Sequence, residues 1–254
     1  MKYAHMTTLA FAAAGIATLT GCDGQQPARA SADTAAAPRQ VIVALDLSGS
    51  QSEERRAQAR NALDRVIDDL QFGDRLVLLQ VHQRSASEDG VVRWQETVPA
   101  PDAGVNPTSL DRERLDAVKQ AARSVAAAIF DDEAAGRIPT TDLIATLHVA
   151  GEYVRDADSR RSSLVLLSDM LQSAHGIEMA GDGGVPSADW ILRQQHGSLL
   201  PQLQRACVII VGADATTPNG IAVREFWTRY FEAAGATLSP RDYRLLATGG
   251  SVAC

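Results

Sequence analysis

The sequence predicts an α/β protein with a doubly wound, mostly parallel central sheet flanked by helices. Three observations lead to this fold class. Short apolar runs of strand length alternate with stretches in which apolar residues recur every three or four positions. The first run, 41–45, is apolar throughout, as in strands that are buried on both faces. A carboxylate and two hydroxyls follow that run, at the strand end where open α/β sheets bind ligands.

The first half of this alternation begins with the strand 41–45. The stretch 52–70 has helical spacing, and Gly73 suits a left-handed cap at its end. Residues 76–81 form the next apolar run. The shorter and more polar run 91–98 predicts an antiparallel strand at the edge of the sheet.

The second half continues the pattern. Apolar residues at helical spacing predict a helix over 109–131 and another that starts at Thr141. The run 164–167 is a buried strand, and 190–203 is helical with an interruption near His196 and Gly197. Residues 207–211 form another strand. Aromatic residues at 226–231 then predict an amphipathic helix, and 243–248 is expected to form the last strand.

The N-terminus has the pattern of a secretory leader. Lys2 precedes an apolar segment, 8–19, which is too short to be a good membrane span, and Leu19-Thr20-Gly21-Cys22 ends it. That ending resembles the lipobox of bacterial lipoproteins, which implies a signal peptide over 1–21 and a diacylated, palmitate-type anchor on Cys22. The alternative is an ordinary secreted protein with a stray cysteine. Asp23 resembles the signal for retention at the inner membrane in enterobacterial lipoproteins, so the folded part would face the periplasm.

Composition divides the rest of the chain into a tether and one domain. Residues 22–39 carry no large apolar side chain and read as a flexible, lipid-anchored tether, and 40–254 has the length of one domain. Removing 1–21 takes away Lys2 alone and leaves 23 basic against 31 acidic residues, a net charge of −8. Without a basic run or a basic-aromatic stripe, this balance argues against nucleic acid as a partner.

The end of the first strand carries the chemistry. Asp46, Ser48 and Ser50 stand at alternate positions on a strand-to-helix turn, and three hard oxygen ligands so placed can converge on one divalent cation. The alternative is a simple turn in which Ser50 or Ser52 caps the next helix. Ser50 and Glu53 have the spacing of a capping box.

The Asp-x-Ser-x-Ser motif resembles the metal-ion-dependent adhesion site (MIDAS) of von Willebrand factor A-type (VWA) domains. That family adds a Thr from a loop that opens a helix and an Asp that ends the fourth strand, and Thr141 and Asp169 match both. The resemblance implies a Rossmann-like VWA domain with five metal ligands: Asp46, Ser48, Ser50, Thr141 and Asp169. The chain departs from the family at two places. It has Pro139-Thr140-Thr141 where the family often has Gly-Gly-Thr, which leaves Thr140 as a substitute ligand for Thr141, and it has Met170 after Asp169 where Gly is common. Each of Thr140, Thr141 and Asp169 has a simpler alternative role as a helix cap.

Two carboxylates and three hydroxyls are an all-oxygen set that suits Mg²⁺, with Mn²⁺ or Ca²⁺ as alternatives. By resemblance to the family, a carboxylate of a protein partner completes the metal shell. The sequence thus favours a non-enzymatic binding module at the bacterial envelope; a scaffold subunit of a larger envelope machine has the same site. The alternative of another class is a Mg²⁺-dependent hydrolase or phosphotransfer protein with Asp46 as nucleophile. Haloacid-dehalogenase-like phosphatases need a second Asp at the position of Ser48, and receiver domains need an acidic pair that residues 39–45 lack.

Two further features stay open at this level. The stretch 171–188 is long and glycine-rich, which suits a specificity loop on the metal face or plain disorder. Cys207 and Cys254 either form a disulfide, as an oxidising periplasm permits, or Cys207 is a lone buried thiol. The histidines at 82, 148, 175 and 196 lack the spacing of a zinc site and are taken as structural or surface residues.

Overall fold

The computed structural model describes residues 37–49, 52–81, 91–132, 140–158, 160–180 and 184–246. Strands and helices alternate over most of this length. Strands span β1 Arg39–Leu45, β2 Arg75–Gln80, β3 Val92–Thr97, β4 Arg161–Leu167, β5 Cys207–Val211 and β6 Thr237–Arg244. Helices span α1 Glu53–Asp68, α3 Ser109–Phe130, α4 Leu143–Arg155, α5 Ala188–His196 and α6 Pro218–Ala233.

The six strands form one sheet in the order β3-β2-β1-β4-β5-β6. Every neighbouring pair is parallel except β2 and β3, which are antiparallel. The predicted fold class and its antiparallel edge strand are therefore confirmed. From β1 the chain runs outward to β2 and β3, and from β4 it runs the other way to β5 and β6, so the topological switch point lies between β1 and β4.

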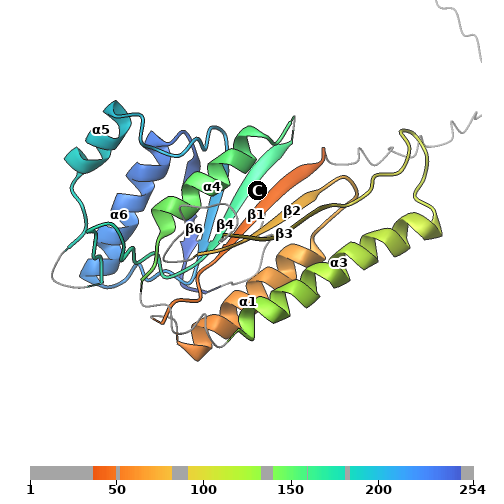
Figure 1. The fold of residues 1–254 in the computed structure, drawn as a ribbon, viewed down its shortest axis with the longest axis horizontal. Coiled ribbons are helices and arrows are strands. Elements are labelled where there is room, and N and C mark those ends of the chain that lie inside the picture. Colours follow the sequence, from red (N-terminus) through yellow and green to blue (C-terminus); the bar gives the residue numbers. More distant parts are fainter. Residues whose placement is uncertain are drawn as a thin grey trace, which may run out of the picture. The chain divides into compact units, whose positions relative to one another are not determined.

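Each face of the sheet carries its own hydrophobic core, because successive side chains of a strand point to opposite faces. In β1, Val41, Val43 and Leu45 join one core, which α1 and α3 complete, whereas Ile42 and Ala44 join the other. The second core is completed by α4, α5 and α6. Figure 1 shows α1 and α3 side by side along one side of the sheet, and α5 beside α6. Covering both faces explains why β1 and β4 carry apolar residues on both faces after their polar first residues.

Three elements differ from the sequence predictions. α6 begins at Pro218, before its aromatic residues, because the Thr217 hydroxyl accepts a hydrogen bond from the backbone N–H of Gly220 and Pro218 fits the first helical turn. β6 begins at Thr237, six residues earlier than expected, because this edge strand is mostly polar and has no apolar run to mark it. α5 spans Ala188–His196, so the predicted helix over 197–203 is wrong, because Gly197 caps α5 and Ser198 takes a φ of +55°.

The end of α1 also differs. The helix stops at Asp68, and Gly73 lies beyond it in the turn that leads to β2, with a φ of +82°. A Cβ at Gly73 would lie 2.9 Å from Cγ of Pro38, so the turn needs glycine both for its backbone angle and for this close approach.

β1 starts at Arg39, one residue before the predicted start of the domain. The Arg39 guanidinium donates hydrogen bonds to Oδ2 of Asp74 from Nε at 3.2 Å and from Nη2 at 2.7 Å, and the Arg39 backbone N–H donates to Oδ1 at 2.8 Å. The expected signal peptide 1–21, lipidated Cys22 and most of the tether lie outside the described residues. Among the described helices, none is long and apolar enough to cross a membrane.

Candidate metal site at the carboxyl edge of the sheet

The carboxyl ends of β1, β4 and β5 are held next to one another by backbone hydrogen bonds. The N–H of Asp46 donates to the carbonyl of Leu167 at 3.0 Å, and the N–H of Ser168 donates to the carbonyl of Val211 at 3.0 Å. Asp46 therefore follows β1 at the same level at which Ser168 and Asp169 follow β4. Two of the predicted ligands thus lie on neighbouring strand ends at the switch point.

Asp46 is buried, with 2% of its surface exposed, and both of its carboxylate oxygens accept hydrogen bonds. Oδ1 accepts from the backbone N–H of Ser48 at 3.0 Å, and Oδ2 accepts from the hydroxyl of Ser168 at 2.7 Å. The Ser168 hydroxyl in turn accepts from the N–H of Met170 at 2.9 Å. Ser168 therefore orients the Asp46 carboxylate. The sequence reasoning gave Ser168 no role, since nothing in its local pattern shows that it faces the neighbouring strand end.

Asp169 is also buried, and its carboxylate lies beside a cation from the protein itself. Oδ1 accepts from the N–H of Leu171 at 3.1 Å, while Nη1 of Arg55 lies 3.5 Å from Oδ2. Arg55 belongs to the first turn of α1 and is about one-third exposed. The α1 helix thus places a positive charge at the edge that holds the two buried acids.

Thr141 is fixed by the loop that follows Asp169. Its N–H donates to the hydroxyl of Ser173 at 2.8 Å, and its carbonyl accepts from the N–H of Ser173 at 3.0 Å. The side chain is 3% exposed and lies two residues before the start of α4. The resemblance required a Thr just before a helix at this edge of the sheet, and Thr141 has this position.

The residue that caps α4 is Asp142, not Thr141. Oδ1 of Asp142 accepts from the N–H of Ala145 at 3.1 Å, and Oδ2 lies 2.7 Å from Nε2 of His175. A second side chain shares the capping role. Oε1 of the fully buried Gln172 accepts from the N–H groups of Leu143 at 2.8 Å and Ile144 at 3.2 Å.

The stretch 171–188 is anchored by two buried side chains, although several of its described residues are exposed. Within 171–180, Gln172 and Met179 have no exposed surface, and the N–H of Met179 donates to the carbonyl of Gln172. Met170, which precedes this stretch, adopts a φ of +65° and its carbonyl accepts a hydrogen bond from the indole of Trp227 in α6. Residues 171–180 are therefore ordered, and the alternative of disorder is wrong for them. The role of Gln172 could not be predicted, because a polar residue in a long loop has no sequence pattern that indicates burial.

Two acidic groups and a tyrosine complete the electrostatics of this edge. Burial raises the pKa of Tyr243. The positive charge of Arg224 acts against this increase, whereas the negative charges of Asp169 and Asp214 add to it. The hydroxyl of Thr216 is the main cause that lowers the pKa of Asp214 to about 2, and the N–H of Thr216 and hydroxyl of Thr217 add to it.

Four of the five predicted ligands are described, and all four are buried polar residues: Asp46, Ser48, Thr141 and Asp169. Ser50 lies outside the described residues. The donors are oxygens only, with two carboxylates that retain lone pairs, so their chemistry fits a hard divalent cation. Within the described ranges, no group of three or more His, Cys, Asp or Glu side chains is placed to hold a metal ion, so a site here depends on hydroxyl oxygens.

The structure describes the state of Cys207 and the positions of three of the histidines. Cys207, the first residue of β5, is disulfide-bonded, so the lone buried thiol is wrong. Cys254 and Cys22 lie outside the described residues, and the pairing of Cys207 with Cys254 stays a prediction. His148 and His196 are exposed, whereas the sequence gave no sign of the contact between His175 and Asp142.

No protein-family model matches this chain, and curated protein sequences gave no match either. Similar solved structures include a von Willebrand factor type A structure from Catenulispora acidiphila, with 16% identity and a TM-score of 0.42 over 80% of this chain and 38% of that one. An aerotolerance-related membrane protein from Bacteroides fragilis NCTC 9343, carrying multiple mutations to serines, has 11% identity and a TM-score of 0.40 over 79% of this chain and 90% of that one. A pilus adhesin, SpaC, from Lactobacillus rhamnosus GG in its open conformation has 14% identity and a TM-score of 0.42 over 82% and 27%. The chain thus spans less than half of the length of the first and third of these structures.

Proposed function

We propose that the protein is a divalent-cation-dependent binding module that captures an acidic group of a protein partner. The observation that carries this proposal is the pair of buried carboxylates, Asp46 and Asp169, on neighbouring strand ends at the switch point of a parallel sheet. A cation at this edge would offset the charge of both buried carboxylates. Ser48 and Thr141 add neutral oxygens at the same edge.

This donor set favours Mg²⁺, with Mn²⁺ or Ca²⁺ as alternatives, because all its atoms are hard oxygens. In the proposal, Asp46, Ser48, Thr141 and Asp169 hold the ion together with Ser50. The ion supplies a positive centre that a carboxylate of the partner can join. Ser168 keeps the Asp46 carboxylate in one orientation, and the contacts between Ser173 and Thr141 fix the opening turn before α4.

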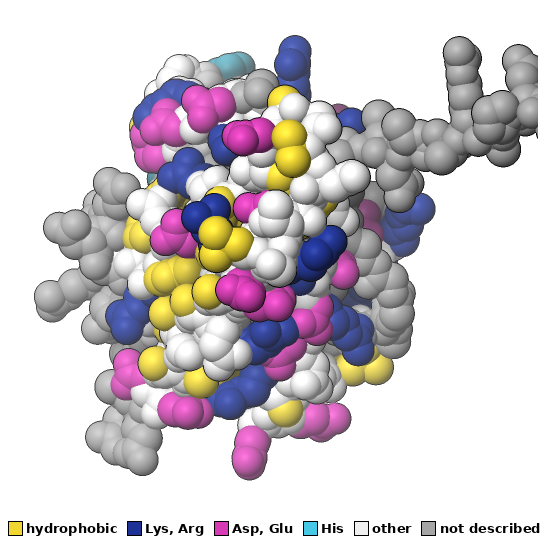
Figure 2. Space-filling view, turned by 90° about the vertical axis from the view of Figure 1, so that its right-hand side faces the viewer, with side chains coloured by type: hydrophobic (Ala, Val, Ile, Leu, Met, Phe, Trp, Pro, Cys, Tyr) yellow, Lys and Arg dark blue, Asp and Glu magenta, His cyan; other side chains and the backbone are white. Residues whose placement is uncertain are grey.

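The proposal has the protein act by binding, without turnover. The two carboxylates each accept a hydrogen bond from a neighbouring backbone N–H, from Ser48 to Asp46 and from Leu171 to Asp169. These bonds hold the two carboxylates in place, which suits a metal ligand. Figure 2 shows Lys and Arg side chains interspersed with Asp and Glu side chains on one face of the molecule. That face therefore has no extended patch of positive or of negative charge.

We place the protein at the bacterial envelope, on the inner membrane and facing the periplasm. Cleavage after residue 21 would leave a lipid on Cys22, and residues 22–39 would hold the domain away from the lipid surface. The support for this placement is the leader pattern and the Leu19-Thr20-Gly21-Cys22 ending. Several acyl chains on one cysteine anchor stably, whereas a single chain binds only marginally.

The first experiment measures cation binding. Titration calorimetry of the purified full-length chain with Mg²⁺ or Mn²⁺ should give binding that Asp46→Asn weakens by at least tenfold, since a ligand charge is lost. The matched control is Asp116→Asn, which removes an exposed acid of α3. Equal affinities for the wild type and Asp46→Asn would refute the site.

The second experiment tests capture of a partner. A pull-down from detergent-solubilised envelope, in Mg²⁺ and then in EDTA, should retain an acidic partner only with the metal. Thr141→Ala should weaken this capture, and Thr228→Ala, at an exposed threonine of α6, should not. If the partner is still captured in EDTA and by Thr141→Ala, the proposed metal site is not the surface that binds the partner. Phosphate-ester hydrolysis that Asp46→Asn abolishes would instead support the hydrolase alternative.

A further inference from the structure

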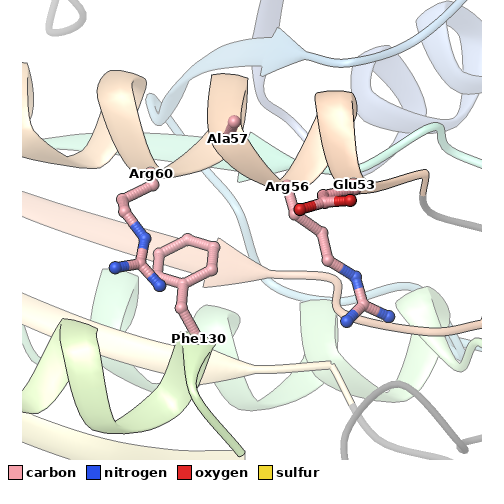
Figure 3. A pocket seen from close by; sticks show the side chains of 5 residues that line it. All are labelled: Glu53, Arg56, Ala57, Arg60 and Phe130. Carbon is pink, nitrogen blue, oxygen red and sulfur yellow. The ribbon is translucent and has the colours of Figure 1, made fainter. Parts of the chain in front are cut away.

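A cavity of about 500 Å³ lies between the N-terminal half of α1 and the last residue of α3. It is lined by Glu53, Arg56, Ala57, Arg60 and Phe130 (Figure 3). The cavity adjoins the candidate metal edge, because Nη2 of Arg56 lies 3.4 Å from the carbonyl oxygen of Leu47. Leu47 stands between the two proposed ligands Asp46 and Ser48.

Arg60 is already fixed by two contacts. Its guanidinium carbon lies 5.0 Å from the centre of the Phe130 ring, and Nη2 donates to Oδ1 of Asp131 at 2.8 Å. Figure 3 shows the guanidinium of Arg60 against the ring of Phe130. The positive charge of Arg60 is therefore balanced by Asp131, and the ring and Ala57 give the cavity an apolar wall.

Arg56 is not fixed in the same way. Its Nε is buried and has no hydrogen-bond partner, and its bond to the Leu47 carbonyl is at the long end of the range. Because Nε has no accessible surface, an incoming acceptor would meet the terminal Nη groups of Arg56, whose only described bond is the long one to Leu47. The flat guanidinium fork matches the two oxygens of a carboxylate.

We propose that this cavity binds a second carboxylate of the same acidic partner segment whose first carboxylate joins the metal. This inference rests on the proposed function for the placement of the first carboxylate. Glu53 lines the cavity and Asp131 balances Arg60, so the two arginines and the two acids cancel in net charge, and recognition depends on the hydrogen-bond donors of Arg56. A site without surplus positive charge favours a singly charged carboxylate over a phosphate dianion. The apolar wall of Phe130 and Ala57 suits the methylene groups of a glutamate side chain.

The test uses synthetic peptides with the purified full-length chain. Each peptide is blocked at both ends and carries one Asp and one Glu joined by glycine linkers of increasing length, and a matched series replaces Glu with Gln. In Mg²⁺, at least one spacing should bind about tenfold more tightly with Glu than with Gln, the gain expected of a charge-assisted hydrogen bond. Arg56→Gln should remove this gain, Arg56→Lys should restore part of it, and Arg65→Gln, at an exposed arginine of the same helix, should leave it intact.

The outcomes separate the inference from the proposed function. Mg²⁺-dependent binding of the Gln peptides, with no gain from Glu at any spacing, overturns the cavity inference and leaves the proposed function standing. A gain from Glu that Arg56→Gln removes, but without any dependence on Mg²⁺ or on Asp46, supports the cavity and counts against the metal site. If free N-acetylglutamate competes as well as the peptide, the cavity serves a small carboxylate and the assignment to a partner segment is wrong.

Discussion

Gln172→Leu tests whether the loop after β4 holds α4 in place. Gln172 has no exposed surface, and its Oε1 accepts hydrogen bonds from the N–H groups of Leu143 and Ile144 in the first turn of α4. Its Nε2 donates to Oδ1 of Asp142 at 3.3 Å. Leucine is somewhat larger than glutamine and has no amide, so the substitution removes these bonds without opening a cavity. The first-turn N–H groups of a helix have no partner within the helix, so both lose their acceptor.

The expected cost follows from the two donors left unsatisfied. Each buried N–H without an acceptor costs about 1–3 kcal/mol, and water that reaches the helix start recovers part of this. We therefore expect Gln172→Leu to lower the free energy of unfolding by about 2–4 kcal/mol. With a urea m-value of about 3 kcal/mol/M, this moves the unfolding midpoint down by roughly 1 M.

The assay is urea unfolding followed by circular dichroism, at equal m-value for the two chains. The control is Gln120→Leu, which makes the same chemical change on the exposed face of α3 and should alter stability by less than about 0.5 kcal/mol. If Gln172→Leu is as stable as the Gln120→Leu control, the hydrogen bonds of Gln172 do not hold the start of α4, and the reasoning is refuted.

Three further predictions concern the edge, the acid range and the anchor. Arg55→Gln should tighten Mg²⁺ binding by about threefold in calorimetry, because the metal no longer competes with the partly exposed ion pair to Asp169; unchanged or weaker binding contradicts this. Asp214 has a pKa lowered from 3.8 to about 2, chiefly by Thr216, so it stabilises the fold above about pH 4 and this contribution is lost as the pH falls towards 2. The difference in thermal midpoint between wild type and Asp214→Asn should therefore be small but present at pH 7 and shrink in acid, and a constant difference argues against the linkage. Cys22→Ala should release the exported protein from the membrane fraction, and its retention there would exclude the lipid anchor.

The central strands could be predicted because a strand that is buried on both faces has a continuous run of apolar residues. The predicted strand 207–211 agrees with β5 at both ends, and all five of its residues are apolar. The edge strand β6 has no such mark, because one of its sides lacks a neighbouring strand and its residues are largely polar. Its start at Thr237 is set by pairing with Cys207 of β5, which is a tertiary contact.

The candidate site divides in the same way. The spacing from Asp46 to Ser48 and the strand ends before Asp46 and Asp169 are local, so they can be read from the sequence. The partners of these side chains are not local: Ser168 reaches Asp46 from the end of the neighbouring strand, and Arg55 reaches Asp169 from helix α1. Sequence periodicity gives the face of an element but does not give the neighbour that the face meets.

By itself, the sequence determined the fold class, the alternation of strands and helices, and the oxygen donors that follow β1 and β4. These depend on apolar periodicity and on residue type, which are properties of short segments. Only the tertiary structure decided that β1 and β4 are adjacent, that Gln172 caps α4, and that Arg56 borders a cavity beside Leu47. Such contacts join residues far apart in the chain, and packing around the whole sheet selects them, so no single segment carries the information.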